Sequence, residues 1–161
     1  MIRPATPRDY PAILAFWNPV IRDTTVTFSS EEKTPESLEA MIAARRAAGQ
    51  EFFVAEEAGT VLGFVTYGQF RGGNGYLYAM EHTIILAPEA RGRGVGRGLM
   101  SALEDHARAG GVHLMVGGIS AENAAGVAFH AAMGFAEAGR VREAGRKFDR
   151  WIDLVLMQKI L

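Results

Sequence analysis

The chain of 161 residues contains no cysteine. This absence excludes disulfide bonds, a catalytic thiol and thiolate metal ligands. Its four histidines do not follow the HExxH spacing of zinc enzymes, so we expect no metal site. No apolar run approaches the roughly 18 residues that span a membrane, and the first residues show no signal-peptide pattern. We therefore expect a cytoplasmic protein without a membrane partner.

Neither sign of charge dominates the sequence. Seventeen Lys and Arg residues face 18 Asp and Glu residues, for a formal net charge of −1. Because nucleic-acid binding depends on neutralising phosphates, this balance predicts no nucleic-acid partner. A length of 161 residues suits one core, so we expect a single domain over residues 1–161.

Hydrophobic spacing predicts a mixed α/β domain with the order β-α-α-β-β-β-α-β-α-β. Thr6-Pro7 and Thr34-Pro35 are typical helix starts, and Asn18-Pro19 is predicted to end the first helix. Residues 24–28 are predicted to be extended, and 145–148 to form a turn. Strands are predicted over 1–5, 52–55, 61–67, 76–86, 113–119 and 151–157, and further helices behind Gly98 and over 123–133.

A glycine-rich segment joins a predicted strand to a predicted helix. Residues 91–98 read Arg-Gly-Arg-Gly-Val-Gly-Arg-Gly, between the apolar run Thr83–Leu86 and an amphipathic segment from Leu99. Glycines let several backbone N–H groups point to one spot, and the helix N-terminus adds the positive end of its dipole. The segment therefore predicts a phosphate or pyrophosphate site.

The better-known phosphate motifs do not fit this segment. No glycine set has the 1-3-6 spacing of the dinucleotide fingerprint, and no P-loop Gly-Lys-Ser/Thr follows. The segment does match Arg-x-x-Gly-x-Gly as Arg91–Gly96, and in this it resembles the acetyl-coenzyme A loop of the GCN5-related N-acetyltransferases (GNAT). The short pattern alone is also compatible with a solvated turn rich in arginine and glycine.

Further segments resemble one branch of that family, the phosphinothricin and methionine sulfoximine N-acetyltransferases. The resemblance covers residues 2 to 161 and implies the GNAT acyl-CoA N-acyltransferase fold, acetyl-CoA as cosubstrate and a homodimer. The segments that carry it are Ile2–Ala5, Glu81-His82, Ala87-Pro88, Arg91–Gly98, Asn123, Gly134-Phe135 and Gly145–Phe148 with Trp151 and Asp153.

The resemblance also implies which residues contact acetyl-CoA. The loop amides would hold the pyrophosphate, the apolar run would pair with the pantetheine arm, and Asn123 would contact that arm. A plain N-cap is an equal alternative for Asn123. His130 would lie near the sulfur, although a structural histidine is the safer interpretation. The implied cofactor residues are Ile84, Ile85, Leu86, Arg91, Gly92, Arg93, Gly94, Val95, Gly96, Arg97, Asn123 and His130.

Glu81 is the candidate general base. It comes two residues before the apolar run, and partial burial would raise the pKa of its carboxyl group towards neutrality. The alternative is a rim salt bridge to Arg71 or Arg91. His82 follows directly, but alternation along a strand points it to the opposite face, which predicts a structural or substrate-wall role.

The resemblance places further residues on the substrate side. Arg71 would bind a carboxylate, Phe28 and Asn18 would line the pocket, and Lys147 would reach in from a neighbouring subunit. The family's arginine and histidine before the base are replaced by Leu77 and Tyr78. This departure predicts a less anionic substrate than phosphinothricin, such as methionine sulfoximine or sulfone.

The sequence thus predicts an acetyl-CoA-dependent N-acetyltransferase that acts on a small amino-acid-like amine by direct attack. The absence of cysteine excludes a covalent acetyl-thiol intermediate. Two alternatives stay open: an acetyltransferase of proteins or peptides, and a non-catalytic acyl-CoA sensor.

Overall fold

The computed structural model describes all residues 1–161. It contains seven strands and four helices in one mixed α/β domain. The strands are β1 (Ile2–Pro4), β2 (Phe52–Glu57), β3 (Thr60–Gln69), β4 (Ala79–Leu86), β5 (Leu114–Ser120), β6 (Ala136–Lys147) and β7 (Arg150–Ile160). The helices are α1 (Tyr10–Asp23), α2 (Pro35–Ala47), α3 (Val95–Ala109) and α4 (Ala124–Ala132), with 3-10 turns at Pro7–Asp9, Asn74–Tyr76 and Pro88–Ala90.

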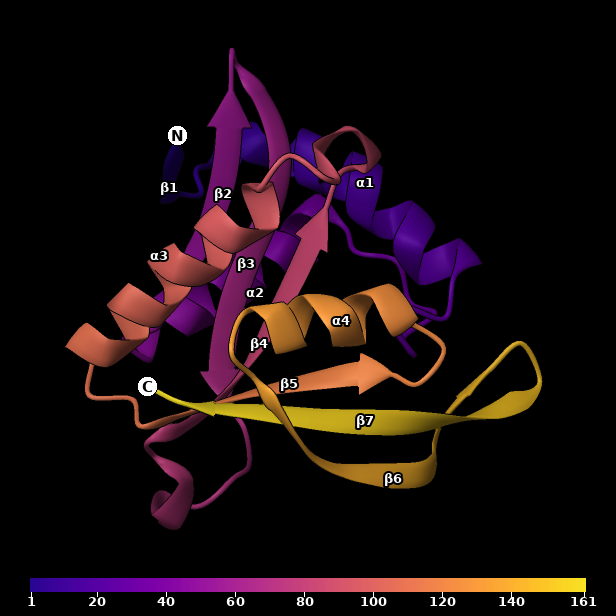
Figure 1. The fold of residues 1–161 in the computed structure, drawn as a ribbon. Helices are drawn as coiled ribbons and strands as arrows, with labels where there is room; N and C mark the ends of the chain where they lie inside the picture. The colour runs from indigo at the N-terminus through magenta and orange to yellow at the C-terminus, as the bar shows by residue number, and fades with distance from the viewer.

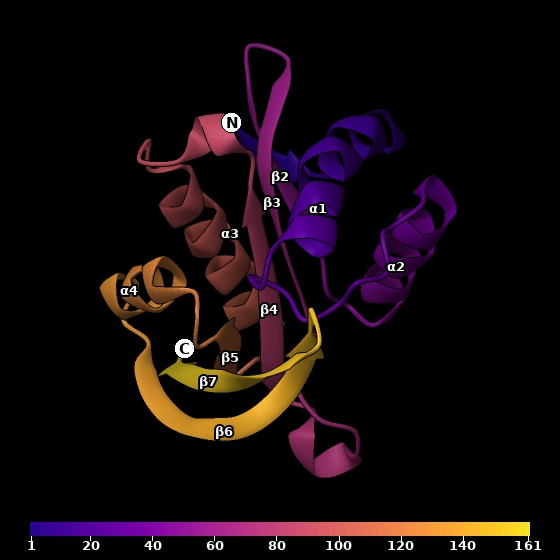
Figure 2. The same cartoon turned by 90° about the vertical axis from the view of Figure 1, so that its right-hand side faces the viewer.

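One sheet separates two layers of helices. Its strand order is β1-β2-β3-β4-β5-β7-β6, and only β4 and β5 pair in parallel. α1 and α2 cover one face, while α3 and α4 cover the other (Figure 2). The alternation of β3 divides the core accordingly, because Phe64 packs with α1 and Val65 packs with α3. None of the helices is long and apolar enough to span a membrane.

Helix α3 shows how local sequence sets the element behind the glycine loop. Gly94 precedes it with φ +77°, a left-handed conformation that glycine adopts without strain. Leu99, Met100 and Leu103 are fully buried, as the amphipathic pattern predicts. The helix therefore starts inside the glycine segment, at Val95, four residues before the predicted amphipathic stretch.

Helix α1 corrects one sequence prediction. The helix runs through Pro19 to Asp23, although Asn18-Pro19 was predicted to end it. A proline removes one hydrogen bond to the preceding turn. The buried side chains Ile13, Trp17 and Ile21 on both sides of Pro19 keep the helix on the sheet.

The other differences lie where the hydrophobic signal is weak. β6 was not predicted, because it is an edge strand that pairs only with β7 and is exposed at most positions. Residues 145–147 belong to that strand, and the turn falls at Phe148-Asp149, both with positive φ. β4 begins at Ala79 rather than residue 76, after the 3-10 turn. Residues 24–28 do not form the predicted strand, since residues 25–28 form bends.

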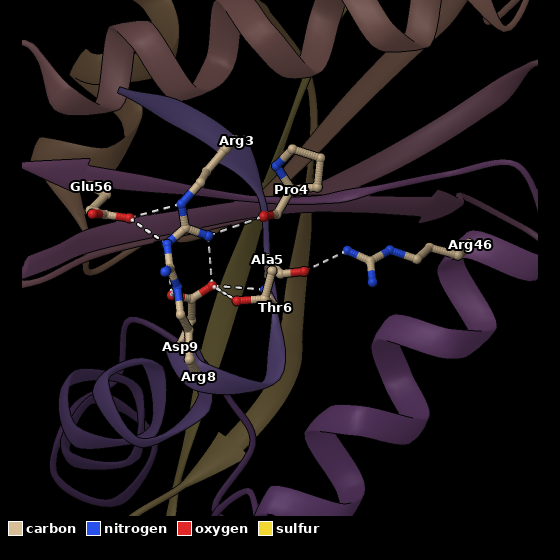
Figure 3. A network of polar contacts seen from close by, with 8 residues as sticks. All are labelled: Arg3, Pro4, Ala5, Thr6, Arg8, Asp9, Arg46 and Glu56. Carbon is tan, nitrogen blue, oxygen red and sulfur yellow. Dashed lines mark hydrogen bonds and ion pairs between the residues drawn. The ribbon is translucent and has the colours of Figure 1, made fainter. Parts of the chain in front are cut away.

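An ion-pair network fixes the N-terminal strand (Figure 3). The guanidinium of Arg3 donates to both carboxylate oxygens of Asp9 at 2.8 Å and also to Glu56. Asp9 accepts a further bond from the backbone N–H of Thr6, and Arg46 on α2 donates to the carbonyl of Ala5 at 2.8 Å. These contacts connect β1 to the 3-10 turn Pro7–Asp9, to β2 and to α2.

Candidate active site

The site is built where two central strands diverge. β4 and β5 pair only between Ala79–Glu81 and Leu114–Val116, after which their arrows point apart (Figure 1). β4 continues beside β3, and β5 continues beside β7. The open edge of β4 borders a cavity of about 480 Å³ between these strands, the α1–α2 connection and the start of α4. An extended ligand could add to such an edge through backbone hydrogen bonds.

Glu81 lies on the cavity wall, on the α1–α2 face of β4. Its carboxylate is accessible to solvent and forms no hydrogen bond or salt bridge. The surrounding walls nevertheless remove part of the water around the carboxylate, and this burial raises the pKa of Glu81. The positive charge of Arg45 lowers that pKa, but by less. The predicted alternative, a rim salt bridge to Arg71 or Arg91, is absent. Glu81 is therefore a free carboxylate with increased basicity.

Arg45 on α2 is a neighbour of Glu81 that sequence reasoning missed. Its guanidinium packs on Gly68, the residue opposite Glu81 in the β3–β4 register; a Cβ on Gly68 would lie 1.8 Å from Nη1. The side chain makes no hydrogen bond, and its Nε is buried without a partner. Burial lowers the pKa of Arg45, and the charge of Glu81 opposes this effect.

Lys33, in the α1–α2 connection, also lines the cavity and was not predicted. Asn18 clamps its backbone, since the Asn18 amide donates to the Lys33 carbonyl at 2.9 Å and accepts from the Lys33 N–H at 2.8 Å. The Lys33 ammonium lies 5.3 Å from the ring centroid of Trp17. Asn18, predicted on the substrate side, is thus used to hold Lys33 and does not line the cavity.

His82 and His130 form a buried pair whose Nε2 atoms are 2.8 Å apart. His130 Nδ1 lies 2.7 Å from the Gly126 carbonyl, which can only accept, so Nδ1 carries the proton. Nε2 of neutral His130 then accepts from Nε2–H of His82. Burial, followed by the proximity of His130, lowers the pKa of His82 to about 3.

The pair confirms that His82 points away from Glu81, into the α4 side of the sheet. Nδ1 of His82 is left buried without a hydrogen-bond partner. Burial also lowers the pKa of His130, while the Gly126 backbone opposes it. Both protons of the neutral pair are already shared, so neither ring offers a proton to the cavity.

The glycine segment presents unpaired donors. The backbone N–H groups of Gly92, Gly94, Val95, Gly96 and Arg97 donate to no carbonyl. Gly92 and Gly94 have φ values of +74° and +77°, which turn the chain around this point.

Two arginines of the segment are also unpaired. Arg91 and Arg97 make no ion pair, whereas Arg93 pairs with Glu57 at the end of β2. Free amides at a helix N-terminus beside arginines fit a pyrophosphate.

Phe28 lines the cavity, and the end of β6 supports it. A Cβ on Gly145 would lie 2.3 Å from Cδ2 of Phe28, so the ring occupies the space above the glycine. The ammonium of Lys147 donates to the carbonyls of Ile21, Thr27 and Ser29 at 2.6 to 2.8 Å. Lys147 was predicted to reach a neighbouring subunit's substrate. This prediction is wrong, because the side chain is buried within its own chain and holds the Phe28 segment.

Residues 2–156 match the family model described as an acetyltransferase (GNAT) domain. The chain belongs to the GNAT acetyltransferase family. It is 37% identical over 158 residues to the L-methionine sulfoximine/L-methionine sulfone acetyltransferase of Pseudomonas paraeruginosa, covering 98% of this chain and 92% of that protein. The resemblance found in the sequence is thereby confirmed, as is the predicted N-acetyltransferase activity.

Solved GNAT structures agree with the fold. The ribosomal-protein-alanine N-acetyltransferase from Brucella melitensis superposes with a TM-score of 0.96 at 39% identity, covering 100% of this chain and 99% of that one. The phosphinothricin acetyltransferase from Sinorhizobium meliloti, solved in complex with acetyl-CoA, gives a TM-score of 0.93 at 28% identity, with coverages of 100% and 88%. GNAT neighbours of this chain therefore bind acetyl-CoA.

The remaining predicted cofactor residues of this GNAT domain border the cavity or its rim. Ile84 and Ile85 line it on the open edge of β4, and Asn123 lines it at the start of α4. Asn123 is the N-cap, with its side-chain oxygen accepting from Gly126 N–H at 3.0 Å, while its Nδ2 makes no hydrogen bond. Leu86 packs beside Gly96, where a Cβ would lie 3.4 Å from its Cδ1.

The segment between β3 and β4 lies outside the cavity. Arg71, predicted to bind a carboxylate, is exposed, and its guanidinium lies 5.8 Å from the Tyr76 ring. Leu77 and Tyr78, the departures from the family pattern, are 51% and 64% exposed. None of these three residues lines the cavity, so they do not shape its walls.

Proposed function

We propose that this GNAT acetyltransferase transfers an acetyl group from acetyl-CoA to the α-amino group of a small amino-acid-like substrate, with Glu81 as the general base. The observation that carries the proposal is the position of Glu81. Its unpaired carboxylate lies on the wall of a cavity of about 480 Å³, beside the open edge of β4. This volume is within the range of small-molecule sites.

Acetyl-CoA supplies the acetyl thioester that the amine attacks. The free amides of Gly92, Gly94, Val95, Gly96 and Arg97, with the side chains of Arg91 and Arg97, would hold its pyrophosphate. The open edge of β4 at Ile84 and Ile85 would pair with the pantetheine arm, and the free Nδ2 of Asn123 could donate to it. These donors are present without rearrangement, which supports the assignment.

Glu81 would accept the proton that the amine loses as it attacks. Only about a tenth of α-amino groups with a pKa near 8 are neutral at pH 7, so a base at this position accelerates the reaction. Because burial raises the pKa of Glu81, the carboxylate binds a proton more strongly than an exposed glutamate would. Backbone N–H groups at the open edge of β4 could stabilise the developing oxyanion.

The departing thiolate requires little help. Thiols have pKa values near 8.5, so a thiolate is an adequate leaving group at neutral pH. The hydrogen bonds of the His82–His130 pair leave it no free proton, and we therefore assign it a structural role in the cavity wall. A cysteine-linked intermediate is impossible in this chain.

Two kinds of amine are supported to different degrees. The Pseudomonas relative acts on methionine sulfoximine and sulfone, and a cavity of about 480 Å³ suits compounds of this size. The similarity to a ribosomal-protein-alanine N-acetyltransferase favours a second candidate, a protein N-terminus. The volume of the cavity is within the range of small-molecule sites, so we place the small amino acid first.

Turnover with a panel of amines tests the proposal. Thiol release from acetyl-CoA would be measured with L-methionine sulfone, L-methionine sulfoximine, phosphinothricin and a peptide with N-terminal alanine. We expect the sulfone and sulfoximine to react fastest. Faster acetylation of the peptide would favour the second candidate, and tight acetyl-CoA binding without turnover would favour an acyl-CoA sensor.

The homodimer stays a prediction that sedimentation velocity can test, and the cytoplasmic location stays a prediction as well.

A further inference from the structure

The cavity holds two opposite charges that are not paired with each other. Glu81 lies on β4 and Lys33 lies in the α1–α2 connection, and both line the cavity. Neither side chain forms a salt bridge or a hydrogen bond with any protein group. A partly enclosed charge without a counter-ion favours a ligand that supplies one.

Lys33 is held in place by its surroundings. The side-chain amide of Asn18 donates to the carbonyl of Lys33 and accepts from its N–H, which fixes the backbone at this position. The ammonium faces the ring of Trp17, which is itself buried and lines the cavity. Cation–π contact and a fixed backbone restrict the side chain, so that less rotational entropy is lost when an anion binds.

The other cations near Glu81 are placed differently. Arg45 packs on Gly68 behind the wall and does not line the cavity, Arg71 is exposed outside it, and the two histidines are neutral. The free arginines Arg91 and Arg97 belong to the glycine loop. Lys33 is thus the cationic side chain among the cavity-lining residues.

We propose that Lys33 binds the acidic group of the substrate and thereby selects an amine that also carries a carboxylate. The amine would face Glu81 and the carboxylate would face Lys33, so the two ends of a zwitterion match the two charges of the cavity. Asn18 is a positioning residue that acts through Lys33. This inference rests on the proposed function and refines it, because it names the residue that recognises the acid.

A matched pair of substrates tests the inference. L-methionine sulfone carries the carboxylate, whereas its carboxamide keeps the amine and side chain but lacks that charge. In Lys33→Gln we expect KM for the sulfone to rise on the order of 10- to 100-fold, the range for a lost hydrogen bond between charged groups. KM for the carboxamide should change less than about twofold. Lys33→Arg should restore part of the preference, and Asn18→Ala should lose a smaller part of it.

Arg22→Gln is the control, because it removes the same charge from an exposed position in surface ion pairs on α1. Equal effects of Lys33→Gln on both compounds, or none on either, would overturn the inference, and a sulfone-specific effect in Arg71→Gln alone would assign the role to Arg71. Calorimetry with coenzyme A present gives the same comparison without turnover, because it measures the dissociation constants of both compounds for the wild type and for Lys33→Gln. Absence of turnover in the wild type would therefore count against the proposed function, while the binding ratio would still decide the role of Lys33.

Discussion

Replacement of Glu81 by glutamine is the most direct test of the catalytic assignment. Glutamine has the same shape but cannot accept a proton at neutral pH. Because the Glu81 carboxylate makes no hydrogen bond or salt bridge, the substitution leaves no protein group without its partner. We therefore expect the fold and the melting temperature of Glu81→Gln to match those of the wild type.

The size of the effect follows from the two titrating groups. Without the base, only the neutral amine reacts, and this form makes up about a tenth of an amine of pKa near 8 at pH 7. General bases contribute about 10²- to 10⁴-fold, so we expect kcat to fall on the order of 100-fold or more at pH 7. The remaining rate of the variant should rise about tenfold per pH unit until the amine is neutral.

Initial rates of thiol release from pH 5.5 to 9.5 measure this effect, with L-methionine sulfone as the amine. The wild-type rate should fall on the acid side as Glu81 becomes protonated, at a pH above that of an ordinary glutamate because burial raises its pKa. Glu39→Gln, which alters an exposed carboxylate on α2, serves as the control. An unchanged rate and pH profile in Glu81→Gln would refute the assignment.

Three further substitutions test the surroundings of the site and of the fold. Arg45→Met removes the charge that lowers the pKa of Glu81, so the acid limb of the pH profile of kcat should move to higher pH. An unchanged limb would show that Arg45 does not influence the titration of Glu81. Gly145→Ala should displace Phe28 and raise KM for the amine by severalfold, whereas Gly139→Ala in the same strand meets no atom within 4 Å and should behave as wild type. Asp9→Asn should lower the free energy of unfolding at pH 7 by about 2 kcal/mol, because its bonds to Arg3 hold the pKa of Asp9 at about 2 instead of 3.8. The lowered pKa stabilises the fold above about pH 4, and this stabilisation is lost as the pH falls towards 2. In urea unfolding, the difference in free energy of unfolding between wild type and Asp9→Asn should therefore be smaller at pH 2 than at pH 7. Asp149→Asn, at a fully exposed position, is the control.

Several features of the site could be read from the chain because they depend on neighbours in sequence. The glycine segment 91–98 predicts free amides at a helix N-terminus, since backbone conformation there is set by the glycines themselves. The alternation of Glu81 and His82 follows from strand geometry. The N-cap role of Asn123 depends only on the three residues that follow it.

The weakly patterned parts of the chain were less predictable. β6 is exposed along most of its length, so no hydrophobic alternation marks it, and its pairing with β7 defines it as a strand. Pro19 is a helix breaker by local rules, and only the packing of Trp17 and Ile21 explains why α1 continues. Arg71 was predicted from the sequence to bind a carboxylate, but neither it nor the β3–β4 connection that carries it lines the cavity.

By itself, then, the sequence determined the kind of fold, the family, the glycine segment with its free amides and the choice of Glu81 as candidate base. Only the tertiary structure decided which charges surround that base. Lys33 and Arg45 come from the α1–α2 connection and α2, more than 30 residues before Glu81, and nothing in their own sequence neighbourhood marks them. The pairing of His82 with His130 and the burial of Lys147 against three carbonyls have the same origin. Such contacts depend on how the helices pack on the sheet, and local patterns of hydrophobicity and charge do not record that packing.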